Sequence, residues 1–246
     1  MPRRRSASCI AGYTTASFPG VGDLLCGDYR DVLLPRGVEP DLLCSDTPYS
    51  EKTVTGHDDG AGASADGSER RLLGYGYWGE DDVRDFVEDW APRTRGWFVM
   101  LTDHVLAPMW ADYLAAEDRY VFAPLPFVAP GSRVRLRGDG PACWTCQIVV
   151  ARPKSRRYAS WGALPGAYVS PPGTRERGLG VVGHKSQWVM RSLVYDYSRH
   201  GELVVDPTAG SGSTLLAARA EGRLALGAEK DPRAFAKYAH RIGGSR

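Results

Sequence analysis

A glycine-rich turn near the C-terminus has the residue types needed to hold a small ligand. The segment Glu202-Leu-Val-Val-Asp206-Pro-Thr-Ala-Gly210-Ser-Gly212 joins an apolar run, an aspartate and two glycines, and Ser213 is expected to begin a helix. Glycine lets the backbone approach a ligand closely, and the first turn of a helix has free N–H groups. Asp206 would repel a phosphate and attract an amine. The glycine pattern of this turn is not GxGxxG, and the turn has no P-loop lysine, so a dinucleotide or nucleoside triphosphate site is disfavoured here.

A second acidic residue follows the next apolar run. Residues 224–228 are predicted to form a strand, and Glu229 comes directly after it. An acidic side chain at the end of the second strand of such a unit is placed to bind both hydroxyls of a ribose. A glycine-rich turn in an α/β domain that binds no ligand is the alternative interpretation.

The segment Ser45-Asp46-Thr47-Pro48-Tyr49 combines an acid, a restricted backbone and an aromatic ring after the apolar run 42–45. Asp46 and the Thr47 carbonyl can each accept a hydrogen bond from an exocyclic amine, and Tyr49 can stack on a flat ring. Sites in α/β sheets lie at the carboxyl ends of strands, where this segment is expected. An ordinary Asp-x-Pro turn is the alternative.

Alternating strands and helices are predicted to position these segments in an α/β sheet. The expected strands are continuous apolar runs, typical of strands covered on both faces: 24–26, 42–45, 97–101, 120–127, 146–151, 202–205 and 224–228. Helices are expected at 81–90, 106–117, 186–199, from Ser213 onward, and after the N-cap Asp231, where Phe235, Tyr238 and Ile242 share a face. The Gly-, Ser- and Asp-rich stretch from 50 to about 79 is predicted to be a mobile loop.

The two chemical segments together resemble the amino-methyltransferases that act on exocyclic nitrogens of DNA bases and use S-adenosylmethionine (SAM). The stretch around Asp206 is similar to the family's SAM-binding motif, DPFAGSGTT, and the stretch around Asp46 to its catalytic motif, (D/N/S)PP(Y/F). Here the catalytic motif comes first, as in the permuted β-type members. Gly27-Asp28 and His184-Lys-Ser-Gln187 also match family segments, so the resemblance covers residues 22–50 and 183–242.

The resemblance implies an α/β, Rossmann-like class I methyltransferase fold with a seven-stranded, mostly parallel sheet and a circularly permuted order of motifs. It places SAM on Asp28, Ser186, Gln187, Asp206, Ala209, Gly210, Ser211, Gly212 and Glu229. Within that set, Glu229 would hold the ribose and Asp28 the adenine amine. Asp206 and the 209–212 turn would surround the methionine moiety, and Ser186 and Gln187 its end. The flipped base would be gripped by Asp46, Thr47, Pro48 and Tyr49.

Two positions depart from the family pattern. The first proline of the catalytic motif is Thr47 here, which keeps the carbonyl but gives a less restricted turn. The lysine and final proline of the upstream segment are Trp188 and Val189, so any charge contact made by that lysine is lost. These departures are the only support for a catalytically silent homologue that binds SAM and DNA.

The resemblance implies methylation of double-stranded DNA, with adenine N6 preferred because Asp46 is the residue commoner in adenine members. Cytosine N4 is the alternative target. A methyltransferase of RNA or protein is disfavoured by the motif order and by Asp46. The DNA-contacting residues are expected in a small insertion, 129–183, within a single catalytic domain, 1–246. This segment holds aromatic and basic residues: Arg133, Arg135, Arg137, Trp144, Arg152, Lys154, Arg156, Arg157, Tyr158, Trp161, Tyr168, Arg175 and Arg177.

Composition sets limits on these expectations. The 246 residues carry a formal net charge of only +2, which excludes a strongly basic nucleic-acid coat but permits a local basic face, for which a solvated surface loop is the alternative. No apolar run is long enough to span a membrane, and a lone CxxC at Cys143 and Cys146 predicts no metal site. A reducing cytoplasm, of a bacterium or a phage-infected host cell, is expected. We expect no room for a large recognition domain. Three alternatives follow: the recognised DNA site is short, recognition of the DNA sequence is relaxed, or a second subunit helps, as in a homodimer.

Overall fold

The computed structural model describes residues 8–10, 13–18, 22–58, 76–131, 143–154, 161–172 and 185–236. The chain divides into two compact units, each assembled from segments distant in the sequence. Unit 1 comprises Met1–Asp46, Pro92–Val99 and Glu176–Arg246, and unit 2 comprises Thr47–Ala91 and Met100–Arg175. Each unit is described by itself below.

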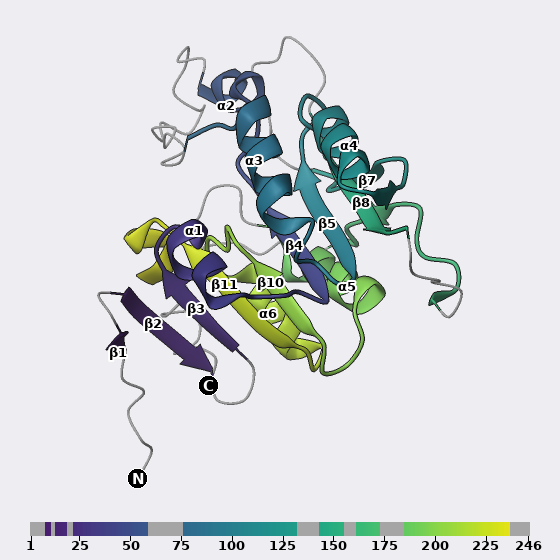
Figure 1. The fold of residues 1–246 in the computed structure, drawn as a ribbon. Helices are drawn as coiled ribbons and strands as arrows, with labels where there is room; N and C mark the ends of the chain where they lie inside the picture. The colour runs from purple at the N-terminus through teal and green to yellow at the C-terminus, as the bar shows by residue number, and fades with distance from the viewer. Residues whose placement is uncertain are drawn as a thin grey trace. The chain divides into compact units, whose positions relative to one another are not determined.

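Four parallel strands form the centre of unit 1, in the order β3 (Gly22–Cys26), β11 (Leu224–Glu229), β10 (Leu203–Asp206) and β4 (Leu42–Asp46). Figure 1 shows β3, β11 and β10 side by side. The side chains of Leu42, Leu43, Cys44, Val204 and Val205 are all fully buried. Burial on both faces explains why these strands are apolar throughout and do not alternate.

The sheet of unit 1 continues on both sides of this centre. On one side β2 (Tyr13–Phe18) pairs antiparallel with β3, and β1 (Ser8–Ile10) pairs antiparallel with β2. On the other side β5 (Trp97–Thr102) begins where the Trp97 N–H donates to the Asp41 carbonyl at 3.0 Å. A Cβ on Gly96 would lie 2.0 Å from that carbonyl oxygen, so only glycine fits at this approach.

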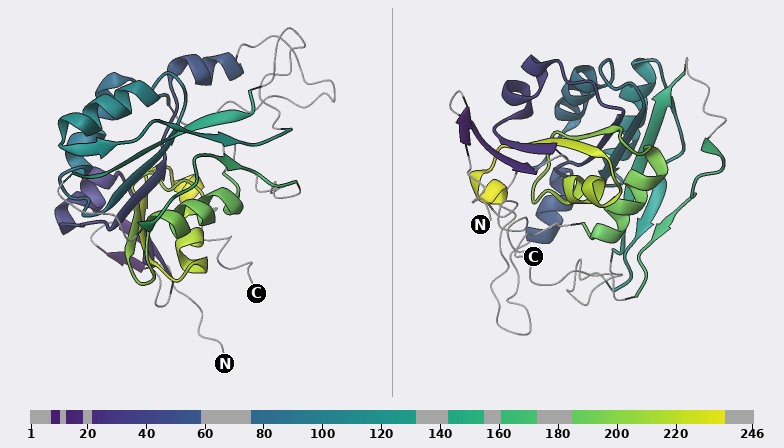
Figure 2. Two further views of the ribbon diagram at one scale, coloured as in Figure 1. Left: turned by 90° about the vertical axis from the view of Figure 1, so that its right-hand side faces the viewer. Right: turned by 90° about the horizontal axis from the view of Figure 1, so that it is seen from below.

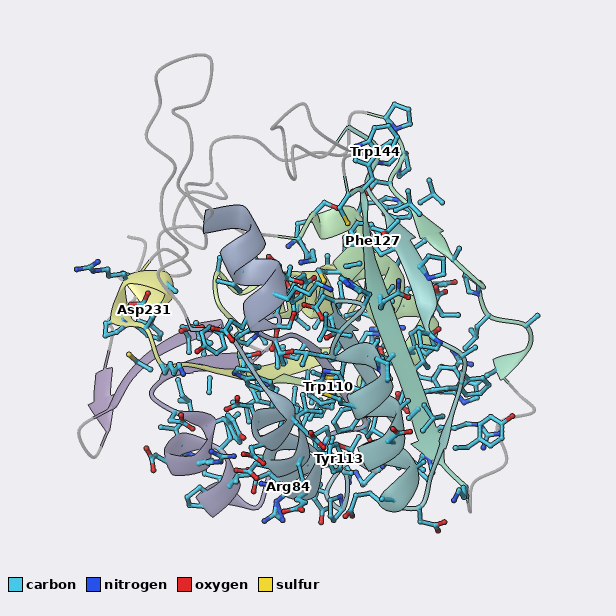
Figure 3. All side chains as sticks on the ribbon, turned by 90° about the horizontal axis from the view of Figure 1, so that it is seen from above. Arg84, Trp110, Tyr113, Phe127, Trp144 and Asp231 are labelled. Carbon is cyan, nitrogen blue, oxygen red and sulfur yellow. The ribbon has the colours of Figure 1, made fainter. Side chains whose placement is uncertain are left out.

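Helices α5 (Gln187–Tyr197) and α6 (Ser213–Ala220) pack on one another, and Figure 2 shows them as neighbours. Helix α6 contacts β10 and β11, and α5 contacts β4. Short helices α1 (Tyr29–Val32) and η1 (Leu34–Arg36) follow β3. After β11, Asp231 (labelled in Figure 3) accepts from the Arg233 N–H at 2.8 Å and caps a helical segment at 232–236, as the sequence predicts.

Unit 2 contains α2 (Glu51–Asp58), α3 (Glu80–Trp90), α4 (Ala107–Ala116), β6 (Arg119–Val121), β7 (Leu125–Val128), β8 (Thr145–Pro153) and β9 (Tyr168–Val169). Strands β6 and β7 both pair antiparallel with β8, and β9 pairs parallel with β7. An aromatic cluster fills the space under α3 and α4, where Trp78 stacks on Trp110 and Phe86 meets Trp110 edge-on. In Figure 3 Trp110 lies on α4, beside α3, which carries Arg84.

The predicted strands and helices correspond to elements of the structure, with four corrections. The run 120–127 is not one strand: it divides into β6 and β7, and Pro124, which has no N–H to donate to a sheet, lies in the break between them. The described strands number eleven and not seven, since β1, β2 and β9 were not anticipated. The stretch after Ser50 is not a loop from its start, because α2 occupies its first eight residues. Helix α5 ends at Tyr197, two residues before the predicted end.

Several expected features lie outside the described residues. These are His184, the helix face at Tyr238 and Ile242, and basic or aromatic positions of the expected DNA-contacting segment: Arg133, Arg135, Arg137, Arg156, Arg157, Tyr158, Arg175 and Arg177.

Candidate active site at the carboxyl ends of the parallel strands

The four central strands of unit 1 present acidic residues at one edge of the sheet. Asp28 follows β3, Glu229 ends β11, Asp206 ends β10 and Asp46 ends β4. Because these strands are parallel neighbours, their carboxyl ends meet at the same edge. The chain leaves β10 toward β11 and leaves β4 toward β5, in opposite directions. The gap between β10 and β4 is therefore a topological switch point, where α/β sheets place their ligands.

Asp206 joins this edge to the neighbouring strand. Its Oδ1 accepts from Ser45 Oγ at 2.5 Å and from the Thr208 N–H at 3.2 Å, and its Oδ2 accepts from Thr214 Oγ1 at 2.5 Å. Ser45 Oγ also lies 2.7 Å from Thr208 Oγ1. Asp206 thus ties the residue before Asp46 to both ends of the glycine-rich turn.

Burial dominates the electrostatics of Asp206. Only 2% of its surface is exposed, and this desolvation raises the pKa of Asp206 from 3.8 to about 6, although the hydrogen bonds from Ser45 and Thr214 oppose the shift. The nearby Asp46 carboxylate raises this pKa further. A buried carboxylate with a raised pKa has a strong preference for a cationic partner.

Glu229 is held by two backbone amides. Its Oε2 accepts from the Gly210 N–H at 2.7 Å and its Oε1 from the Asp231 N–H at 2.7 Å. Burial raises the pKa of Glu229, and these two hydrogen bonds reduce the shift. Each carboxylate oxygen can accept a second hydrogen bond, so this orientation leaves capacity for a pair of hydroxyl donors.

The turn between β10 and α6 is built by glycine. Gly210 and Gly212 have φ of 53° and 75°, in the left-handed region that other residues avoid. The Ala209 N–H donates to the Ala228 carbonyl at 2.9 Å, which holds the turn against β11. A Cβ on Gly227 would lie 3.0 Å from the Asp206 carbonyl oxygen, but a Cβ on Gly210 would meet nothing within 4 Å. Open space therefore lies next to the Gly210 backbone.

Asp28 lies near Glu229 because of the pairing of β3 with β11. Cys26 is in register with Glu229, and the Gly27 N–H donates to the Glu229 carbonyl at 2.9 Å. Asp28 is the N-cap of α1, where its Oδ1 accepts from the Arg30 N–H at 3.0 Å. The cap orients this partly exposed carboxylate at the sheet edge.

Ser186 and Gln187 begin α5. Gln187 Nε2 donates to the carbonyl of Ser213, the first residue of α6, at 3.0 Å. The Ser186 hydroxyl is buried and has no hydrogen-bond partner among the described residues. A buried hydroxyl without a partner is costly, so it is suited to a ligand that supplies one.

A lysine that the sequence analysis did not consider contacts Asp46. Lys185 Nζ donates to Asp46 Oδ2 at 2.9 Å, and the two side chains are 15% and 25% exposed. Trp188 stands where the family has a lysine, and Lys185, three residues earlier, supplies a different cation. Lys185 is visible in the sequence within His184-Lys-Ser-Gln187, but only tertiary structure brings it to Asp46 at the end of β4.

The remaining residues of the catalytic motif, Thr47, Pro48 and Tyr49, belong to unit 2. The Tyr49 carbonyl accepts from the Trp78 N–H at 3.0 Å. Ser50 donates to Asp103 Oδ2 through its N–H at 2.9 Å and its hydroxyl at 2.5 Å. The peptide group that follows Tyr49 is therefore held at both its carbonyl and its N–H.

Asp103 holds two segments at once. While its Oδ2 binds Ser50, its Oδ1 accepts from the Val105 and Leu106 N–H groups at 3.0 and 2.9 Å. Burial alone would raise the pKa of Asp103, but hydrogen bonds from Ser50, Thr53 and Leu106 outweigh it and the net pKa is lowered. Asp103 follows β5 directly, and no local sequence motif marks it.

Part of the expected DNA-contacting segment is described. Trp144 is 46% exposed at the start of β8, and Figure 3 shows it and Phe127 near one end of the β7–β8 pair. Arg152 on β8 lies over the rings of Tyr120 and Phe122, with its guanidinium carbon 4.7 and 5.7 Å from their centroids. A half-buried cation thus lies against two exposed aromatic rings on unit 2.

Comparisons with known proteins agree with this arrangement. The family model described as DNA methylase matches residues 176–240, which include the glycine-rich turn, β11 and Glu229. Over these residues the resemblance to the amino-methyltransferases of DNA is confirmed. A search of curated proteins found no match.

Solved methyltransferase structures share the fold at low sequence identity. The M1.HpyAVI–SAM complex has a TM-score of 0.66 and 16% identity, covering 90% of this chain and 99% of that one. TTHA0409 from Thermus thermophilus, complexed with S-adenosyl-L-methionine, has a TM-score of 0.59 and 18% identity, covering 89% and 91%. PvuII DNA methyltransferase, which is cytosine-N4-specific, has a TM-score of 0.63 and 15% identity, covering 91% and 86%. The class I methyltransferase fold is thus confirmed.

Within the described residues, no helix has the length and apolar character needed to cross a membrane.

Proposed function

We propose that this protein is a SAM-dependent DNA methyltransferase that methylates an exocyclic base amine. The observation that carries the proposal is the junction of β4 and β10, where Ser45 binds Asp206 and so brings Asp46 beside the glycine-rich turn. Asp46 and the glycine-rich turn are far apart in the chain, and both follow parallel strands of unit 1 at the same sheet edge, which supports the proposal. The match of residues 176–240 to the DNA methylase family supports the same function.

The residues at this edge fit SAM. Open space beside Gly210 can accept a ligand, and the carboxylate of Glu229 has capacity for two ribose hydroxyls. Asp206 begins the turn and suits the amino group of the methionine moiety, and the buried Ser186 hydroxyl needs a partner. Asp28, Gln187, Ala209, Ser211 and Gly212 complete the proposed contacts. When bound, SAM supplies an electrophilic methyl group.

Asp46 and Thr47 would activate the target. An aryl amine is a poor nucleophile because its lone pair is delocalised into the ring. Hydrogen bonds from the amine to the Asp46 carboxylate and the Thr47 carbonyl favour a pyramidal nitrogen and stabilise the positive charge that develops there. Pro48 restricts the backbone between them, and Tyr49 offers a stacking surface for a base turned out of the duplex.

Adenine N6 in double-stranded DNA is the preferred target, on the basis of Asp46 at the first motif position. Cytosine N4 is the second candidate, because PvuII methyltransferase, which shares the fold, is cytosine-N4-specific. The exposed Trp144 and the Arg152–Tyr120–Phe122 cluster are the described candidates for contacts with DNA.

Methyl transfer provides the test. Purified protein is incubated with tritiated SAM and unmethylated genomic DNA, and the labelled nucleoside is identified after digestion. We expect N6-methyladenine, and we expect Asp46→Ala to abolish incorporation while its affinity for SAM, measured by calorimetry, stays unchanged. Asp112→Ala, which alters an acid on α4, is the matched control and should keep full activity. Full turnover by Asp46→Ala would refute the assignment of Asp46, and N4-methylcytosine would replace adenine as the target.

A further inference from the structure

The ion pair between Lys185 and Asp46 lies on the group assigned to bind the target amine. The Lys185 ammonium donates to Asp46 Oδ2 at 2.9 Å, and both side chains are mostly buried. An ammonium and an exocyclic amine are both N–H donors that seek the same carboxylate acceptor. Lys185 therefore occupies in this structure an oxygen that the incoming base would use.

Charge argues against the lysine remaining there during methyl transfer. Positive charge develops on the attacking nitrogen, and a fixed ammonium on the same carboxylate would oppose it. An acceptor already neutralised by lysine also stabilises a developing cation less than an unpaired carboxylate does. A lysine that leaves as the amine enters avoids both effects.

The surrounding structure allows Lys185 to leave. It precedes Ser186, the N-cap of α5, so it lies outside the helix. The start of α5 is held separately by the bond from Gln187 to the Ser213 carbonyl. The long lysine side chain can therefore change its rotamer without disturbing α5 or the glycine-rich turn.

We propose that Lys185 occupies Asp46 until an amine-bearing base displaces it, which makes Lys185 a determinant of specificity for the reaction. A base that carries a carbonyl oxygen in place of the exocyclic amine, as thymine does at C4, has no amine there to replace the ammonium and leaves the pair intact. Selection for an exocyclic amine is thus enforced by competition, in addition to direct recognition. This inference rests on the proposed methyltransferase function.

Steady-state methyl transfer from tritiated SAM to unmethylated genomic DNA tests the inference. Lys185→Met removes the competitor, so we expect KM for DNA to fall about fivefold, the scale of a partly exposed ion pair, with kcat not lowered. Lys185→Arg keeps the charge and should retain the wild-type KM. If Lys185→Met lowers kcat at unchanged KM, Lys185 is a positioning residue. If it raises KM, Lys185 is a DNA contact. If neither constant changes, the ion pair has no effect on the reaction. Each of these three results overturns the proposal.

A second measurement does not depend on turnover. Acetylation of Lys185 by acetic anhydride, followed by mass spectrometry, should be several times faster in Asp46→Asn than in the wild type. Lys154, which pairs with Asp118 and is 49% exposed, serves as the internal reference. An equal rate in both proteins would show that the pair does not form in solution, and would overturn the inference. Absence of methyl transfer by the wild type, with Lys185 released normally in Asp46→Asn, would instead refute the proposed function.

Discussion

The hydroxyl of Ser45 donates to Asp206 Oδ1 at 2.5 Å and so joins β4 to the start of the glycine-rich turn. Ser45 is fully buried, and Asp206 is 2% exposed. A hydrogen bond to a buried carboxylate is among the stronger kinds, since loss of the donor leaves the charge less compensated. This contact therefore holds the strand that ends in Asp46, the proposed partner of the target amine, against the proposed SAM site.

Ser45→Ala is expected to lower the free energy of unfolding by about 1–3 kcal/mol at pH 7, because a buried acceptor loses a donor. Urea denaturation measures the change. Ser192→Ala is the control: its hydroxyl donates to the Trp188 carbonyl within α5, and its loss should cost less. Equal losses in the two variants would contradict the importance assigned to the Ser45–Asp206 bond.

Asp206→Asn is expected to remove a pH dependence of stability. The pKa of Asp206 is raised from 3.8 to about 6 in the folded protein, so the folded state binds a proton more tightly than the unfolded chain. Protonation of Asp206 therefore contributes about 3 kcal/mol to the free energy of unfolding. This contribution is complete below about pH 4 and is lost as the pH rises through about 6.

Urea denaturation of both proteins between about pH 4 and pH 8 gives this difference directly. The free energy of unfolding of the wild type, minus that of Asp206→Asn, should decrease across this range. Subtraction removes the contributions of Glu229, Asp103 and the other carboxylates, which the two proteins share. A difference that rises with pH would mean that Asp206 is stabilised as the charged form.

Gly210→Ala is expected to weaken SAM binding by at least about tenfold, because the new methyl group would enter the open space assigned to the cofactor. Gly37→Ala is the matched control. Gly37 has φ of 61°, close to the 53° of Gly210, and its Cβ would also meet nothing within 4 Å. Both variants should lose about 1 kcal/mol of stability through backbone strain, but only Gly210→Ala should change the calorimetric Kd for SAM. Unchanged SAM affinity in Gly210→Ala would show that the cofactor does not bind next to this turn.

Asp103→Asn is expected to reduce methyl transfer about 10- to 100-fold while SAM affinity is retained, because small displacements of a catalytic group are costly. The asparagine oxygen can still accept from Val105 and Leu106, but its NH₂ group would face the Ser50 N–H. Ser50→Ala keeps the backbone donor and should have a smaller effect. Equal activity of Asp103→Asn and wild type would show that the anchoring of the segment after Tyr49 does not affect catalysis.

The sequence by itself was sufficient for the α/β class, for most strands and helices, and for the two segments that carry chemistry. Strands such as 42–46 and 203–206 are apolar runs that end in an aspartate, and the glycine-rich turn has a conformational requirement that only glycine meets. These are local properties of consecutive residues, so they can be recognised without knowledge of the fold. The same holds for the helix that begins after Asp231 and Pro232.

Tertiary structure alone decided which residues act on those segments. Ser45 reaches Asp206, Lys185 reaches Asp46, and Asp103 reaches Ser50, and each pair joins residues distant in the chain. No local pattern encodes such a contact, because it depends on the order and register of strands paired across the sheet. Strands β1 and β2 were missed for the same reason: they are defined by pairing at the sheet edge and not by an apolar run of their own.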